Sequence, residues 1–125
     1  MSYKYSFEKF DVWQDARLFV KEIYTITKLF PSEERYNLCS QIQRASISIV
    51  SNIAEGCGRN SNNEFIHFLN ISIGSVFELE SQLELTKDLG FIQNEYESIK
   101  SEITELKKML FSFQNKLKEK KINNN

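Results

Sequence analysis

Apolar residues recur at alternating spacings of three and four along most of this 125-residue chain. Residues spaced in this way lie on a single stripe of an α-helix, so each run predicts a helix with one apolar face. Four such stripes can be followed. They are Val12, Ala16, Phe19, Ile23, Ile26 and Phe30; Leu38, Ile42, Ala45, Ile49 and Asn52; Phe65, Leu69, Ser72, Val76, Leu79 and Leu83; and Tyr96, Ile99, Ile103, Leu106, Leu110, Phe113 and Leu117.

Helix-breaking residues separate the stripes, since Pro31, Gly56 and Gly90 each follow one of the first three. Because short connections between long amphipathic helices favour antiparallel neighbours, we predict an all-α, antiparallel up-down four-helix bundle. One domain over residues 1–121 accounts for this pattern. The remaining residues, 122–125, are expected to form a disordered tail, because their composition cannot bury enough apolar surface to fold alone.

The third predicted helix opens with a capping-box pair, Ser61 and Glu64, and is apolar on nearly every side. Such a helix is normally buried all round, whereas a bundle helix buries one face. We expect the excess apolar surface of the second and third helices to form the subunit interface of a homo-oligomer. The candidate interface residues are Ile47, Val50, Phe68, Ile73 and Phe77. In the alternative, the third helix simply lies at the centre of a monomer.

Residue types suited to catalysis or metal binding form no recognisable constellation. The single histidine, His67, lacks the carboxylate spacing of a di-iron bundle, and neither Cys39 nor Cys57 belongs to a Cys-x-x-Cys motif. No nucleophile elbow, Walker-type loop or dinucleotide fingerprint occurs. We therefore expect a protein that is not an enzyme and uses no metal or cofactor. The sequence shows no signal peptide and no apolar run of membrane-spanning length, which predicts a cytoplasmic protein without membrane contact.

A basic row that includes one aromatic residue lies opposite the apolar stripe of the first helix. Its members are Arg17, Lys21, Tyr24 and Lys28. Cationic side chains bind phosphates and a tyrosine can stack on a base, so the row predicts weak, sequence-nonspecific nucleic-acid binding, with Arg44, Arg59 and the lysines near the C-terminal end of the chain in support. In the alternative, the row is an ordinary solvated face, because Asp11, Asp15 and Glu22 flank it.

Three polar residues near the end of the second helix, Asn52, Glu55 and Arg59, are interpreted as structural rather than catalytic. An asparagine in a core stripe needs hydrogen-bond partners, or its burial costs roughly 1 to 3 kcal/mol. We expect Asn52 to bond to the backbone or to a polar residue of a neighbouring helix. Such a contact would fix the register between helices, as buried asparagines do in coiled coils.

Several motifs resemble those of the four-helix-bundle proteins encoded in 23S ribosomal RNA intervening sequences. They are Asn52-Ile53-Ala54-Glu55-Gly56, Gly58-Arg59, Glu64-Phe65, Phe68-Leu69, Gly74-Ser75-Val76-Phe77-Glu78-Leu79-Glu80, Phe10-Asp11-Val12-Trp13-Gln14, Phe30-Pro31, Tyr36 and Ser40-Gln41-Ile42. The resemblance implies a homo-oligomeric bundle, commonly a pentamer. A related accessory protein of diversity-generating retroelements, the accessory variability determinant, is a basic barrel. It binds nucleic acid and a reverse transcriptase, so the resemblance implies RNA or DNA and such an enzyme as candidate partners.

The sequence also departs from the pattern of that family. Gln43 and Arg44 stand where the family often has two arginines, and three asparagines around Arg59 stand where lysines are frequent. Because each lost cation lowers the affinity for a polyanion, we expect weaker nucleic-acid binding than in a basic relative. Two functions remain open. One is a nucleic-acid-binding or ribonucleoprotein accessory module, and the other is a protein-interaction scaffold that binds no nucleic acid.

Overall fold

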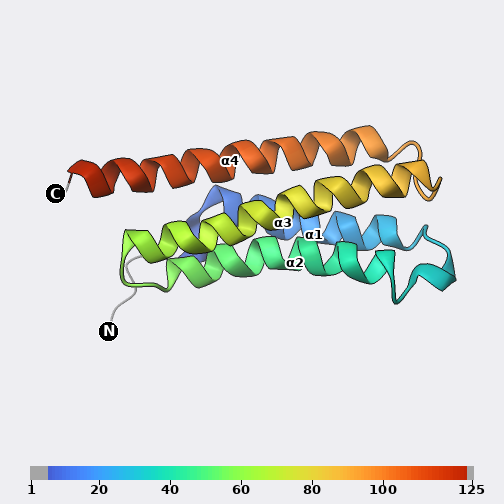
Figure 1. Cartoon of the computed structure of the whole chain (residues 1–125), viewed down its shortest axis with the longest axis horizontal. Helices are drawn as coiled ribbons and strands as arrows, with labels where there is room; N and C mark the ends of the chain where they lie inside the picture. Colours follow the sequence, from blue (N-terminus) through green and yellow to red (C-terminus); the bar gives the residue numbers. More distant parts are fainter. Residues whose placement is uncertain (1–5, 124–125) are drawn as a thin grey trace.

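The computed structural model describes residues 6–123, with side chains through residue 120, and this part of the chain is helical without any strand. Four α-helices make up most of it: α1 (Asp11–Thr27), α2 (Leu38–Cys57), α3 (Asn62–Asp88) and α4 (Tyr96–Asn123). Two 3-10 helices, η1 (Phe7–Lys9) and η2 (Ser32–Glu34), precede α1 and α2. The four α-helices lie lengthwise beside one another (Figure 1). The prediction of an all-α chain with four helices is confirmed.

The two ends of α3 follow the local sequence signals. At the start, the backbone N–H of Glu64 donates a 3.2 Å hydrogen bond to the Ser61 hydroxyl, as the capping-box pattern predicts. At the other end, Gly90 has a φ of 77°, and the N–H of Phe91 bonds back to the carbonyl of Thr86 at 3.1 Å. Glycine adopts this left-handed conformation without a side-chain clash, so α3 can stop and reverse within a few residues.

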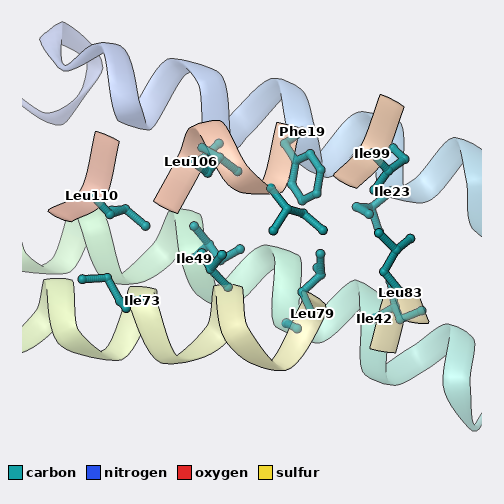
Figure 2. Packing of buried hydrophobic residues seen from close by; sticks show 14 of the residues in the cluster. Phe19, Ile23, Ile42, Ile49, Ile73, Leu79, Leu83, Ile99, Leu106 and Leu110 are labelled. Carbon is teal, nitrogen blue, oxygen red and sulfur yellow. The ribbon is translucent and has the colours of Figure 1, made fainter. Parts of the chain in front are cut away.

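The predicted stripes of the four helices meet in one core. Figure 2 shows side chains from every α-helix pointing into it, among them Phe19 of α1, Ile49 of α2, Leu79 of α3 and Leu106 of α4. Fully burying a side chain of this kind contributes about 1.5 to 3 kcal/mol, which is set against the entropy of ordering the chain. All but two members of the four stripes are buried; the exceptions, Asn52 and Phe113, are half-buried.

The apolar stripe of α2 continues through Ile53 rather than Asn52. Ile53 is fully buried, at 0% exposure, whereas Asn52 is half-buried. After Ile49, a spacing of four fits the helical period as well as a spacing of three, and the packing of the neighbouring helices selects the isoleucine. The prediction that Asn52 belongs to the core stripe is therefore wrong.

Polar contacts link α3 to the helices on either side of it. The buried hydroxyl of Ser72 donates a 2.9 Å hydrogen bond to the carbonyl of Ile49 on α2. The side-chain nitrogen of Lys107 on α4 lies 2.9 Å from a carboxylate oxygen of Glu80 in the second half of α3. Closer to the start of α3, the Asn70 side chain accepts from Gln114, a later residue of α4. The earlier residue of α3 thus pairs with the later residue of α4, so these two contacts run in opposite sequence order along the two helices.

Two helix ends differ from the expected positions. α1 ends at Thr27, four residues before Pro31, and the N–H groups of residues 28–30 bond to carbonyls three positions earlier. α4 continues to Asn123, so residues 122 and 123 of the expected tail are part of this helix, and residues 124 and 125 lie outside the described part of the chain.

Candidate functional site

The predicted basic row forms a line of exposed side chains along α1. Arg17, Lys21, Tyr24 and Lys28 are all exposed, and Tyr24 has 41% of its surface accessible. The guanidinium of Arg17 lies 5.5 Å from the ring centroid of Trp13, a cation–π distance. No ion pair engages the cations of this α1 row within the described part of the chain. The row therefore presents three positive charges and one aromatic ring to the outside.

A hollow between α1 and α2 lies at the C-terminal end of the α1 row. This α1–α2 hollow has a volume of about 460 Å³, and its lining consists of Tyr24, Thr27, Lys28, Phe30, Pro31, Ser32, Arg35, Cys39 and Gln43. Two cations, Lys28 and Arg35, thus share a concave surface with the exposed ring of Tyr24. Sequence reasoning missed Arg35, because it caps the end of η2 and no helical period indicates its direction.

Arg44 lies on α2 and Arg59 lies in the turn between α2 and α3, and neither lines the α1–α2 hollow. The Arg59 guanidinium is 3.5 Å from the Glu55 carboxylate and 4.6 Å from the centroid of the Phe68 ring on α3. These contacts link the end of α2 to α3. Arg59 and Glu55 therefore have structural partners, while Arg44 is exposed. The structure thus separates the predicted cations into the α1 row, Arg44 on α2 and Arg59 in the turn after α2.

Asn52 takes part in a hydrogen-bonded cluster between α2 and α3. Its side-chain amide donates to the backbone carbonyl of Ser48 at 2.8 Å and to the Ser48 hydroxyl at 3.1 Å. The hydroxyl of Ser75 on α3 donates to the same Ser48 oxygen at 2.8 Å. Asn52 thus bonds within its own helix, and the link to α3 passes through Ser48.

Comparison with known proteins decides the family. A sequence model described as 23S rRNA-intervening sequence protein matches residues 8–112. The chain belongs to the 23S rRNA-intervening sequence protein family. It is also similar to a solved crystal structure, that of a protein with unknown function from the S23 ribosomal protein family of Bacteroides thetaiotaomicron. That similarity has 33% identity and a TM-score of 0.77, and covers 83% of this chain and 95% of the other. No curated protein matches the chain.

The matched region of this 23S rRNA-intervening sequence protein contains the α1 row, the α1–α2 hollow and the Asn52 cluster. Gln43, one of the positions where the resemblance leads us to expect arginine, lines the hollow and donates a 3.1 Å hydrogen bond to the Thr27 hydroxyl. An arginine there would add a third cation to the hollow. The match ends before Lys116 and Lys120 of α4.

The candidate interface residues of this 23S rRNA-intervening sequence protein differ in exposure. Ile47 and Phe77 are 42% and 49% exposed, and Val50 and Phe68 are half-buried. Ile73 is 7% exposed and belongs to the core, as Figure 2 shows. The prediction that Ile73 belongs to the interface is therefore wrong, because packing of the four helices already covers the side of α3 on which it lies.

Groups with catalytic potential are few in the described part of this family member. Burial raises the pKa of the Cys57 thiol to about 11, so at neutral pH it stays protonated and is a poor nucleophile. Within residues 6–120, no group of three His, Cys, Asp or Glu side chains could hold a metal ion. None of the described helices is both long enough and apolar enough to cross a bilayer.

One carboxyl group of this 23S rRNA-intervening sequence protein has an unusual environment. Glu102 of α4 lines a hollow of about 250 Å³ with Glu105 and with Asp15 and Glu22 of α1. Burial, a hydrogen bond with Glu22 and the negative charges of Glu22 and Asp15 raise the pKa of Glu102 to about 7. The seam between α1 and α4 therefore carries like charges that repel once Glu102 loses its proton.

Proposed function

We propose that this member of the 23S rRNA-intervening sequence protein family is a non-enzymatic accessory protein that binds nucleic acid weakly and without sequence preference. The observation that carries the proposal is the continuity of the α1 row with the α1–α2 hollow, where Tyr24, Lys28 and Arg35 share one surface. Such a surface suits a phosphate backbone and an unpaired base, because cations contact the phosphates while an aromatic ring offers stacking. Phosphate contacts carry no sequence information and stacking tolerates every base, which favours binding without sequence preference.

We further propose that the subunit is an antiparallel up-down bundle within a cytoplasmic homo-oligomer, with a pentamer as the expected number. The opposite sequence order of the α3 and α4 contacts supports the antiparallel arrangement. The large apolar side chains Ile47, Ile71 and Phe77 are exposed on α2 and α3 and support assembly, because association would remove their apolar surface from water. In an oligomer each subunit would add one α1 row, so affinity for a polyanion would grow with assembly.

Fluorescence anisotropy with labelled single- and double-stranded oligonucleotides of unrelated sequence tests the nucleic-acid proposal. We expect binding at low salt that weakens as salt rises and differs little between sequences. Loss of the Tyr24 ring should weaken single-strand binding more than duplex binding, because only unpaired bases are free to stack. A complete absence of binding at low salt would contradict the proposal.

The exposed Phe77 also favours a second candidate function, a protein-interaction scaffold. Phe77 is half exposed, and its ring packs 4.9 Å from the Lys107 ammonium, which is itself paired with Glu80, so a large aromatic side chain is available to a partner protein. If the protein binds no nucleic acid at low salt, this scaffold function becomes the better account. A reverse transcriptase is the partner class that the family resemblance suggests.

A further inference from the structure

A second concave surface, independent of the α1 row, lies where the start of α1 meets the C-terminal half of α4. This α1–α4 groove has a volume of about 560 Å³. The described residues that line it are Phe10, Asp11, Val12, Lys108, Met109, Ser112, Phe113, Lys116, Leu117 and Lys120. The proposed nucleic-acid surface uses none of them.

The floor of the α1–α4 groove is apolar and held in place by aromatic packing. Phe10, Val12, Met109, Phe113 and Leu117 are its apolar members. The rings of Phe10 and Phe113 lie 4.7 Å apart between centroids, and Phe113 also meets Phe65 edge-on at 5.2 Å. Rings packed at these distances stabilise one another, so the floor is a preformed apolar surface rather than a gap that side chains can close.

The rim of the α1–α4 groove is cationic. Lys108, Lys116 and Lys120 line it with a single acidic residue, Asp11, and all three lysines are exposed. The ion pairs within residues 6–120 are Glu55–Arg59 and Glu80–Lys107, so none of the three lysines is neutralised there. From Lys108 to Lys120 the helix rises about 18 Å. The rim therefore attracts an anion along the length of the apolar floor.

An apolar floor beneath a cationic rim fits a ligand with an apolar body and one negative end. The edges of a nucleic-acid base need hydrogen-bond partners when they leave water, and the uncharged polar side chains of the lining amount to the Ser112 hydroxyl. An aliphatic chain carries no such requirement and gains free energy for each methylene group removed from water. We propose that the α1–α4 groove binds a free acyl carboxylate, with the chain on the aromatic floor and the carboxylate at the lysine rim.

Isothermal titration calorimetry with decanoate, kept below its micelle-forming concentration, tests the proposal on the full chain. We expect one decanoate per chain and weaker binding of decanol, which has the same chain without the charge. Ser112→Trp should weaken decanoate binding about tenfold, because the indole would occupy the groove. Ser101→Trp is the matched control, since Ser101 is exposed on the same helix and does not line the groove; it should leave binding unchanged.

A second variant keeps the test decisive if the tryptophan disturbs the fold. Lys116→Ala with Lys120→Ala should weaken decanoate binding about threefold to tenfold and leave decanol binding unchanged, because only the carboxylate contacts the rim. Circular dichroism would verify that both variants keep their helix content. No heat of binding with decanoate would overturn the proposal, and so would decanoate binding that neither variant weakens. Binding to anionic phospholipid vesicles without binding of free decanoate would overturn it as well, in favour of a membrane surface.

Discussion

The hydroxyl of Ser48 on α2 accepts a 2.8 Å hydrogen bond from the hydroxyl of Ser75 on α3. The same oxygen also accepts from the side chain of Asn52, so one serine joins the two helices and also holds the asparagine, whose other hydrogen bond goes to the backbone. Polar groups that are partly buried between helices must find such partners, because leaving one unpaired costs about 1 to 3 kcal/mol.

The Ser48–Ser75 hydrogen bond should have a measurable coupling energy. In a double-mutant cycle of Ser48→Ala and Ser75→Ala, urea denaturation should give a coupling of about 0.5 to 1 kcal/mol, since the cycle cancels the change in helix propensity. The matched cycle of Ser51→Ala and Ser81→Ala, two exposed serines on the same helices, should give a coupling near zero. A coupling near zero in the first cycle would show that the hydroxyls contribute nothing to helix pairing.

Gly56 and Gly74 should respond oppositely to alanine. A Cβ on Gly56 would lie 2.7 Å from the Cδ1 atom of Phe65 and 3.1 Å from the Cβ of Phe68, so Gly56→Ala should destabilise the fold by about 1 to 3 kcal/mol through overpacking. A Cβ on Gly74 meets no atom within 4 Å. Gly74→Ala should stabilise the subunit by about 0.5 to 1 kcal/mol, because alanine favours a helix interior. Thermal denaturation should give a lower melting temperature for Gly56→Ala and a higher one for Gly74→Ala. Equal shifts of the melting temperature in the two variants would contradict this account.

The pH dependence of stability should report the carboxyl cluster of Glu102, Glu22 and Asp15. Because the pKa of Glu102 is raised from 4.5 to about 7, the folded chain binds more protons than the unfolded chain between these values. Its free energy of unfolding should therefore fall as pH rises from about 4.5 to about 7 through this group.

Glu102→Gln should remove that part of the pH dependence and raise stability above pH 7, since the amide carries no charge to repel Glu22. Urea denaturation at pH 5 and pH 8 measures the effect. Glu119→Gln, at an exposed position near the end of α4, is the control and should keep the wild-type profile. If Glu102→Gln loses stability at pH 8 as well as at pH 5, the account of this cluster is wrong.

Phe77→Glu should dissociate the proposed oligomer without unfolding the subunit. Phe77 is 49% exposed, so a charge there leaves the core intact, while the same charge within an interface would be desolvated. Light scattering should show a larger mass for the wild type than for the variant, at equal helix content. Leu89→Glu, at an even more exposed residue beyond the end of α3, should retain the wild-type mass. A wild type that is monomeric at micromolar concentration would refute assembly.

The fold was largely predictable, because the helical period alone assigns most core positions. Val12, Ile42, Leu69 and Ile103 all lie where their stripes predict, and all are buried. The period could not decide between Asn52 and Ile53, since both spacings fit a helix of 3.6 residues per turn.

The candidate sites were less predictable, because they depend on contacts between segments distant in sequence. Arg35 reaches the α1–α2 hollow from a turn, and the α1–α4 groove joins Phe10 to Phe113 across the length of the chain. Ile73 is buried by helices other than its own. A stripe pattern describes one helix at a time and contains no information about which faces of different helices meet.

The salt dependence of nucleic-acid affinity tests the central claim most directly. With a single-stranded oligonucleotide, Lys21→Glu with Lys28→Glu should weaken binding and reduce the slope of log K against log salt by about 1 to 2, since each lost phosphate contact removes about 0.7. Lys9→Glu with Lys118→Glu is the control: it changes the net charge by the same amount at positions outside the α1 row, and it should alter the slope less. Equal slopes for the wild type and the α1 variant would contradict the claim that the row carries the binding.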